Sequence, residues 1–336
     1  MRVILHIGLP KTATTTFQKK VFYPLHEKGL INYLGKKPSS NKSDLFFPVK
    51  NVVSSILKDD ELLFEKNISS NEAILREILC EDKINVLSEE QLTLTAKYDP
   101  DVVYGRIKRL FQNCDVEIIL FIRNQVDMIY SYYVEMYKHF YFKDKKRNAI
   151  NKFYKCVVSE EGVDYYQFNY LWLVGVVSSY LGKDNVNVFM YEDISLCKNL
   201  LSEKVSKFLR VESSYVLKSL EGNRENYKRI SDGKYINDDI SMLGYWRPFV
   251  NYVKKNSFVN ELQIKFLDKD FFYLKNVYSF IVKNVIGKIK VMSGTVHEPL
   301  SEEQKKCIKE RYLKDNMRLC ALNGLSDEKM KEYGYI

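Results

Sequence analysis

A lysine set among small hydroxylated residues is the first group in this chain that could bind a charged ligand. Lys11 is flanked by Pro10, Thr12, Ala13, Thr14 and Thr15. The lysine supplies a full positive charge and the threonine hydroxyls supply hydrogen-bond donors, so together they suit an anion such as a phosphate. We therefore expect a phosphate cradle here. The alternative is a threonine-rich helix cap beside an incidental lysine.

The elements around this lysine would place it at the start of a helix. Residues 3–7 form a nearly all-apolar run, typical of a parallel strand buried on both faces, and Gly8 and Pro10 end it. Apolar residues then recur at helical spacing over residues 17–25, which puts the polar residues 18–20 on the opposite face. Backbone N–H groups at a helix start lack intrahelical partners, and the helix dipole favours negative charge there. The order strand, loop, helix thus predicts an anion site.

An arginine and a serine follow a second apolar run. Residues 116–122 predict a buried strand, and residues 126–141 have the pattern of a helix that Asn124 would start. Arg123 stands just before that helix and Ser131 about two turns into it, so both could reach a ligand at the strand's carboxyl end. An arginine binds a phosphate through parallel hydrogen bonds, and a serine adds a donor. The alternative for Arg123 is a surface charge at a strand end.

Two adjacent carboxylates follow a third apolar run. Residues 84–87 predict a short strand that ends in Ser88, Glu89 and Glu90. Parallel α/β sheets bind ligands at the carboxyl ends of their strands, where a carboxylate can take a proton from an incoming hydroxyl. Alternatively, Ser88 caps a helix with Gln91 in a capping box, and one residue could serve both roles.

The loop around Lys11 differs from the common nucleotide-binding loop. A Walker A loop needs GxxxxGK[ST], whereas Lys11 follows Gly8 by three residues and has no glycine directly before it. The string PKTATT resembles instead the PKTGTT loop with which sulfotransferases hold the 5′-phosphosulfate of 3′-phosphoadenosine 5′-phosphosulfate (PAPS). HIGLPKTATTTFQ is similar to the bacterial carbohydrate-type branch, with Ala13 in place of the family's glycine.

Further strings extend the resemblance. RNQVDMIYS has the Arg-x7-Ser spacing with which sulfotransferases bind the 3′-phosphate of PAPS, with Gln125 where the family usually has proline. VLSEEQL resembles the family's Ser-x-Glu element near the acceptor, which implies Glu90 as the first candidate for the base and Glu89 as the second. The string YED resembles an element that is mainly structural in the family, so we assign Glu192 and Asp193 no catalytic role.

The resemblance implies an α/β, P-loop-like fold for a PAPS-dependent sulfotransferase. We expect a single domain over residues 1–336, with a central parallel sheet of about five strands flanked by helices and a variable helical insertion on the acceptor side at residues 237–292. Lys11 would contact the 5′-phosphate and the bridging oxygen, while Arg123 and Ser131 would hold the 3′-phosphate. The rest of the loop would hold the 5′-phosphate: Pro10, Thr12, Ala13, Thr14 and Thr15. A polar segment would close over the nucleotide with the candidates Arg224, Lys228 and Arg229.

The implied reaction moves a sulfuryl group from PAPS to a hydroxyl, or in second place an amine, of a small-molecule or glycan acceptor. Family analogy favours a saccharide or glycoconjugate. The nucleotide product is 3′-phosphoadenosine 5′-phosphate (PAP), and we expect no metal. Two alternatives stay open: a non-catalytic protein that binds PAP or another nucleotide, and a small-molecule P-loop kinase. The kinase would need a Walker A loop and magnesium-binding residues, which we do not find in the sequence.

Composition is that of a globular protein. The 336 residues are 46% hydrophobic and 28% charged, and the net charge of +9 suits either polyanionic ligands or a solvated basic surface. The six cysteines form no CxxC pair, which argues against a zinc site and a disulfide framework and predicts reduced thiols in a cytoplasmic protein. The chain opens directly on a strand, so we expect no signal peptide, and the apolar residues 170–181 are too few to span a bilayer.

Two basic and aromatic stretches admit several interpretations. Residues 138–155 could bind nucleic acid or form a solvated helix end, but we prefer a mobile basic loop over the acceptor or nucleotide and expect no nucleic-acid partner. Residues 237–292 suit helices that line the acceptor cleft, or an interfacial surface in peripheral contact with a membrane.

Overall fold

The computed structural model divides into two compact units, each described by itself. It describes residues 1–36, 48–95, 97–159, 163–221, 230–231, 234–236, 240–241, 290–292 and 296–336. The first unit comprises Met1–Ile129, Val157–Asn226 and Glu303–Ile336, and the second comprises Tyr130–Cys156 and Tyr227–Glu302. A single domain over the whole chain stays a prediction. Of residues 237–292, where a helical insertion was expected, the structure describes 240–241 and 290–292, which are strands rather than helices, and the rest lies outside the described residues.

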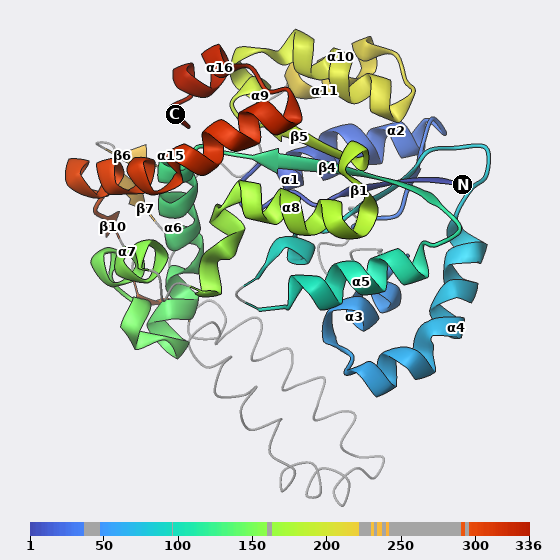
Figure 1. The fold of residues 1–336 in the computed structure, drawn as a ribbon, viewed down its shortest axis with the longest axis horizontal. Helices are drawn as coiled ribbons and strands as arrows, with labels where there is room; N and C mark the ends of the chain where they lie inside the picture. Colours follow the sequence, from blue (N-terminus) through green and yellow to red (C-terminus); the bar gives the residue numbers. More distant parts are fainter. Residues whose placement is uncertain are drawn as a thin grey trace, which may run out of the picture. The chain divides into compact units, whose positions relative to one another are not determined.

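A parallel sheet of five strands forms the centre of the first unit, in the order β2-β3-β1-β4-β5 (Figure 1). The strands are β1 (Arg2–His6), β2 (Asn32–Tyr33), β3 (Asn85–Ser88), β4 (Asp115–Ile122) and β5 (Val186–Met190). Leu5 of β1 pairs with Leu87 on one side and with Ile118 on the other. The predicted α/β fold with a central parallel sheet is confirmed. The short strand β2 was not predicted, because its two residues are too few to show a pattern.

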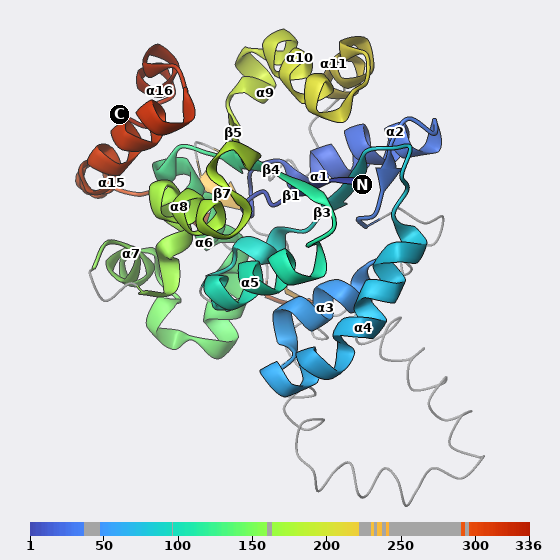
Figure 2. The same cartoon turned by 45° about the vertical axis from the view of Figure 1, so that its right-hand side comes forward.

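Helices cover both faces of this sheet (Figures 1 and 2). One face carries α1 (Thr14–Thr16), α2 (Tyr23–Glu27), α10 (Lys198–Leu209) and α11 (Ser213–Glu221). The other carries α5 (Pro100–Leu110) and α8 (Tyr170–Leu181). The unit also contains α3 (Lys50–Lys58), α4 (Glu61–Ile78), α9 (Asp193–Leu196), α15 (Glu302–Asn323) and α16 (Asp327–Glu332). Phe17, Phe22, Phe121 and Phe189 are buried in the core between the sheet and the first helix layer. These layers leave the carboxyl ends of β1, β3 and β4 side by side, as adjacent parallel strands require.

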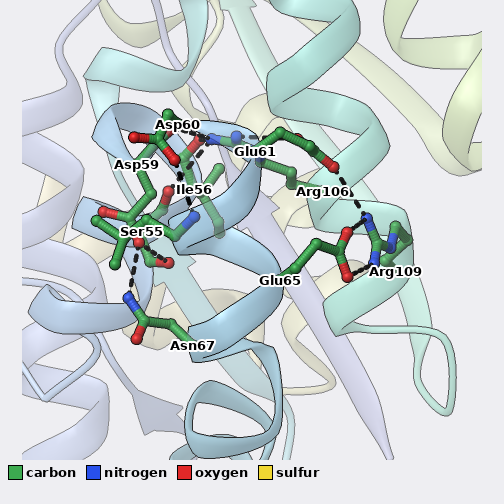
Figure 3. A network of polar contacts seen from close by, with 10 residues as sticks. Ser55, Ile56, Asp59, Asp60, Glu61, Glu65, Asn67, Arg106 and Arg109 are labelled. Atoms are coloured by element: carbon green, nitrogen blue, oxygen red, sulfur yellow. Dashed lines mark hydrogen bonds and ion pairs between the residues drawn. The ribbon is translucent and has the colours of Figure 1, made fainter.

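A buried arginine joins α3, α4 and α5 (Figure 3). Arg106 Nη1 donates to the backbone oxygens of Ser55, Ile56 and Asp59 at 3.4, 3.0 and 2.9 Å, and Nη2 donates to Glu61 Oε2 at 3.1 Å. Three of these acceptors lie at the end of α3, where helix carbonyls lack intrahelical partners. Arg106 therefore caps α3 and ties it to α5.

The second unit is built around aromatic side chains of α6 (Gln125–Lys143), a helix that begins in the first unit. Tyr130 donates its hydroxyl proton to His297 O at 2.7 Å, and Tyr133 packs against Phe153 and against the His297 ring. The unit also contains α7 (Ile150–Val158), β6 (Ile230–Ser231), β7 (Lys234–Ile236), β8 (Ile240–Ser241), β9 (Lys290–Met292) and β10 (Val296–His297). Strands β10, β7 and β6 form one antiparallel sheet, and β8 pairs with β9.

One predicted loop is wrong. Residues 138–155 form the end of α6, a short 3₁₀ turn (Lys145–Arg147) and most of α7, rather than a basic loop. The apolar residues of α7 repeat at helical spacing, which the many lysines of the stretch obscure. Separately, no helix in the described part of the chain is both long enough and apolar enough to cross a membrane.

Candidate active site

The loop after β1 has a constrained backbone. Thr12 bonds twice to Leu9 O, through its backbone N at 3.2 Å and its hydroxyl at 2.6 Å. Lys11 and Ala13 on either side of it have positive φ angles of 72° and 63°. Such left-handed conformations cost a residue with a Cβ about 1–2 kcal/mol, and they concentrate at ligand-binding loops. Ala13 thus occupies, at a cost, a position that suits glycine.

Gly8 opens a small cradle beside this loop. A Cβ at Gly8 would lie 2.6 Å from Thr14 Oγ1, 3.1 Å from Thr12 Oγ1 and 3.5 Å from His6 Nε2. Only a residue without a side chain fits there. Thr14 Oγ1 and His6 Nε2 are both buried, and neither hydrogen-bonds to any of the described residues. Buried polar atoms normally have partners, so these two indicate a place for a ligand or a water.

The helix that follows contains a π-helical turn, Phe17–Phe22, between α1 and α2. This turn rotates Gln18 away from the exposed face predicted for it and buries it, whereas Lys19 remains exposed. Gln18 Nε2 donates to Ser88 Oγ at 3.0 Å, and Ser88 Oγ lies 2.7 Å from His6 Nδ1. Three polar side chains of β1, β3 and the helix therefore meet beneath the loop.

His6 is a neutral imidazole. It is fully buried, with the rings of Phe17, Phe22 and Phe121 around it. Burial lowers the pKa of His6 to about 3, because the charged form would lose its hydration. No role was predicted for His6 or Gln18, although they are the first and last residues of the string HIGLPKTATTTFQ that carries the resemblance. That string was the available signal for both, whereas no local pattern marks the π-helical turn in which Gln18 lies.

The two candidate bases have different surroundings. Glu89 is buried, and its Oε1 accepts from the backbone N of Gln91 at 3.1 Å, which caps a 3₁₀ turn (Glu90–Thr93). Its Oε2 lies 3.3 Å from Lys36 Nζ. Glu90 is the first residue of that turn and is partly exposed. The capping box predicted for Ser88 is wrong, because Ser88 is the last residue of β3 and Glu89 is the cap.

Arg123 lies next to the Lys11 loop. Its Nη1 donates to Lys11 O at 3.4 Å, and its guanidinium carbon lies 4.7 Å from the centre of the Tyr191 ring. Nη2 is 3.9 Å from Asp127 Oδ2, a long ion pair, and the buried Nε hydrogen-bonds to none of the described residues. The side chain is 14% exposed. This is a largely buried cation whose hydrogen-bonding capacity is barely used within the described residues.

The acidic pair after β5 contacts the backbone and the end of the chain. Glu192 Oε1 accepts from Asn124 N at 3.0 Å and Oε2 from the Tyr335 hydroxyl at 2.9 Å. Asp193 Oδ1 accepts from Lys329 Nζ at 2.7 Å. Burial raises the pKa of Glu192, the hydrogen bonds opposing it. These contacts agree with the structural role expected for both residues.

Three groups of predicted residues lie outside this arrangement. Ser131 is buried on α6 but belongs to the second unit, so its pairing with Arg123 stays a prediction. Arg224, Lys228 and Arg229 lie outside the described residues. The structure thus brings together the Lys11 loop, Glu89 with Glu90, and Arg123 at the carboxyl ends of β1, β3 and β4.

Comparisons with known proteins give structural matches alone. No family model matches the chain, and no curated protein does. Among solved structures, it is similar to a sulfotransferase from Alicyclobacillus acidocaldarius, with 12% identity over 69% of this chain and 87% of that one and a TM-score of 0.40. It is also similar to the sulfotransferase domain from the curacin biosynthetic pathway, with 13% identity over 67% of this chain and 80% of that one and a TM-score of 0.39. At identities and TM-scores this low we rest no argument about function on the likeness.

Proposed function

We propose that this protein is a PAPS-dependent sulfotransferase. The observation that carries the proposal is the contact between two sequence motifs, in which Arg123 Nη1 lies 3.4 Å from Lys11 O. The lysine-threonine loop at a helix start can bind one anion, and the largely buried Arg123 beside it can bind another. The two groups follow the neighbouring strands β1 and β4. PAPS has two such anionic ends, a 5′-phosphosulfate and a 3′-phosphate.

The residues of the loop fit the 5′ end of this donor. Gly8 leaves a cradle that a Cβ would fill, and the buried Thr14 hydroxyl, which has no hydrogen-bond partner among the described residues, borders it. Lys11 would hold the 5′-phosphate and the bridging oxygen, with Thr12, Thr15 and the backbone N–H groups after Ala13 as further donors. Arg123 would hold the 3′-phosphate through guanidinium N–H groups, such as Nε–H, that make no hydrogen bond with the described residues.

The donor supplies the sulfuryl group, and the protein positions it and stabilises charge. The sulfur–oxygen bond to the 5′-phosphate would break as a bond from sulfur to the acceptor hydroxyl oxygen forms, and PAP would leave. Lys11 would stabilise the negative charge that develops on the bridging oxygen. A carboxylate would accept the hydroxyl proton.

We assign that proton acceptor to Glu90, with Glu89 as a supporting group. Glu89 is almost fully buried: its Oε1 accepts from the backbone N of Gln91, whereas its Oε2 makes no hydrogen bond with the described residues and lies 3.3 Å from the ammonium group of Lys36. Glu90 follows it directly and is partly exposed, so a substrate can reach it. Replacing Glu90 with Gln should abolish transfer and leave PAP binding intact, whereas the same change at Glu89 should lower stability as well. The acceptor we favour is a hydroxyl of a saccharide or glycoconjugate.

Calorimetric binding of PAP, 5′-AMP, 5′-ADP and ATP tests the donor. PAP differs from 5′-AMP only by the 3′-phosphate, so the ratio of their dissociation constants measures the 3′-phosphate site. We expect the wild type to bind PAP best and Arg123→Ala to lose about 10–100-fold in PAP affinity with little change for 5′-AMP. Arg109→Ala removes an equally charged but half-exposed side chain and is the matched control. Equal binding of PAP and 5′-AMP by the wild type would refute the proposal.

Activity separates an enzyme from a nucleotide-binding protein. Lys11→Ala should abolish release of PAP from PAPS in the presence of an acceptor. A protein that binds PAP tightly but transfers no sulfuryl group to any of a panel of saccharides, phenols and amines would be a PAP-binding protein instead. Preference for ATP together with a magnesium requirement would favour the kinase.

A further inference from the structure

The backbone around Arg123 is held much more firmly than its side chain. Arg123 O accepts from the Tyr170 hydroxyl, and Asn124 N donates to Glu192 Oε1 at 3.0 Å. Asn124 Oδ1 accepts from Val126 N at 3.0 Å and so caps α6. The turn between β4 and α6 thus has its polar groups bound by residues from α8 and from the segment after β5.

Further contacts to this turn come from residues that follow α16. Asn124 Nδ2 donates to Tyr333 O at 2.9 Å and to Gly334 O at 2.6 Å. Tyr335 donates its hydroxyl proton to Glu192 Oε2, the other oxygen of the carboxylate that holds Asn124 N. Burial raises the pKa of Tyr335 well above its ordinary value, so this hydroxyl remains a donor. Residues 333–335 therefore bind the turn both directly and through Glu192.

A glycine makes the direct contact possible. Gly334 has a φ of 75°, and a Cβ placed on it would lie 2.9 Å from Asn124 Nδ2. Asn316 Nδ2 donates to Tyr335 O at 2.8 Å, and Asn316 also exchanges hydrogen bonds with Gln125, the residue after Asn124. Residues 333–335 and the turn thus share one buried polar network.

We propose that residues 333–335 are positioning residues for the 3′-phosphate site, in that they fix the turn from which Arg123 reaches the ligand. They do not touch the ligand themselves. This inference rests on the proposed function. A guanidinium binds a phosphate well only where its N–H groups meet the oxygens at the right angle, so a small displacement of the turn should weaken the 3′-phosphate contact selectively.

Two glycine substitutions test the contact. Gly334→Ala brings a methyl group against Asn124, whereas Gly324→Ala puts the same methyl group at a φ of 60° with nothing within 4 Å. Both variants bear the strain of a positive φ, and only the first meets the turn. We expect the ratio of the 5′-AMP and PAP dissociation constants to fall roughly tenfold in Gly334→Ala and to stay at the wild-type value in Gly324→Ala.

A second variant guards against loss of folding. Tyr335→Phe keeps the backbone and removes only the hydroxyl that binds Glu192, and it should lower the ratio about threefold while 5′-AMP affinity is unchanged. Glu192→Gln keeps an acceptor for Asn124 N and should retain most of the wild-type ratio.

The outcomes distinguish this inference from the proposed function. Wild-type selectivity for PAP that survives in both Gly334→Ala and Tyr335→Phe overturns the inference alone. Equal loss of PAP and 5′-AMP affinity in Gly334→Ala also overturns it, because that result indicates a general structural role. A wild type without selectivity for PAP overturns both.

Discussion

Two largely buried arginines of the first unit have similar surroundings but differ in how many hydrogen bonds their guanidinium groups make with the described residues. Arg106 and Arg123 have side chains that are 6% and 14% exposed, and each lies over an aromatic ring, at 4.5 Å from Phe64 and 4.7 Å from Tyr191. Arg106 donates to three backbone oxygens and a carboxylate (Figure 3). Among the described residues, Arg123 makes one long hydrogen bond and one long ion pair.

The difference indicates what each arginine is for. A guanidinium whose terminal nitrogens bond to the end of a helix, as Nη1 of Arg106 does, stabilises the fold even though its Nε has no partner within the described residues, and its removal leaves carbonyl groups without partners. A guanidinium that is already removed from water but makes few hydrogen bonds loses less hydration when an anion binds, so preorganisation favours binding. The two residues therefore offer a paired test in which stability and ligand binding should respond oppositely.

The largest effect is expected for Arg106→Ala. Loss of three hydrogen bonds at the end of α3 and of one to Glu61 should lower the free energy of unfolding by about 3–5 kcal/mol, with the PAP selectivity of the folded protein unchanged. Urea denaturation and calorimetry measure the two quantities. Arg123→Ala should cost less than about 1 kcal/mol of stability, and a similar loss in both variants would remove the distinction.

His6 is a third buried basic side chain, and unlike Arg106 and Arg123 it is neutral. Its folded pKa of about 3 lies below the ordinary 6.5, so the unfolded chain takes up a proton first as the pH falls. This contribution to stability is complete above about pH 6.5 and is lost progressively down to about pH 3. At pH 5 the loss amounts to about 2 kcal/mol. Urea midpoints between pH 7.5 and 5 should fall less steeply for His6→Asn than for the wild type. Parallel curves would contradict a buried neutral His6.

Lysine substitutions sharpen the distinction between charge and geometry. Arg123→Lys keeps the charge but loses the planar fork, so PAP affinity should drop about tenfold and 5′-AMP affinity should stay the same. Stability should change by less than about 1 kcal/mol. An unchanged PAP affinity, measured by calorimetry, would mean that charge alone suffices at this position.

The smallest effect is expected for the carboxylate that partly neutralises Arg123. Asp127 is 65% exposed and lies 3.9 Å from Nη2, so the ion pair adds little stability. Asp127→Asn should tighten PAP binding about twofold at low salt, because a competing negative charge is gone. The gain should vanish near about 0.5 M salt, where surface charges are screened. Weaker PAP binding in this variant would mean that Asp127 orients the guanidinium.

Local patterns predicted the parts of this protein that local physics determines. Apolar runs indicated β1, β3 and β4, and Asn124 as the start of α6 is confirmed by its bond to Val126 N. Residue type and the family resemblance predicted phosphate-binding roles for Lys11 and Arg123; the structure places Arg123 Nη1 3.4 Å from Lys11 O, and the roles themselves stay a prediction. The two residues follow adjacent parallel strands, so they must lie at the same edge of the sheet.

What sequence could not predict depends on departures from regular geometry or on distant partners. An α-helical period puts Gln18 on the exposed face, and the π-helical turn changes that period. The ion pair between Lys36 and Glu89 joins residues more than fifty positions apart and has no local signal. Glu89 rather than Ser88 caps the turn because Ser88 still belongs to β3.

The hydrogen bonds from Asn124 to Tyr333 and Gly334 have a consequence for synthesis of the chain. They join residues 209 and 210 positions apart. At a translation rate of about 5–20 residues per second, a ribosome needs roughly 10–40 s to travel from one partner to the other. Throughout that interval the nascent chain already contains the lysine loop and the arginine, yet the turn between β4 and α6, from which Arg123 projects, lacks its contacts with residues 333–335. Full affinity for the 3′-phosphate would therefore develop only after the chain has been made as far as Tyr335, and the nucleotide would stabilise chains that contain residues 333–335 more than shorter ones.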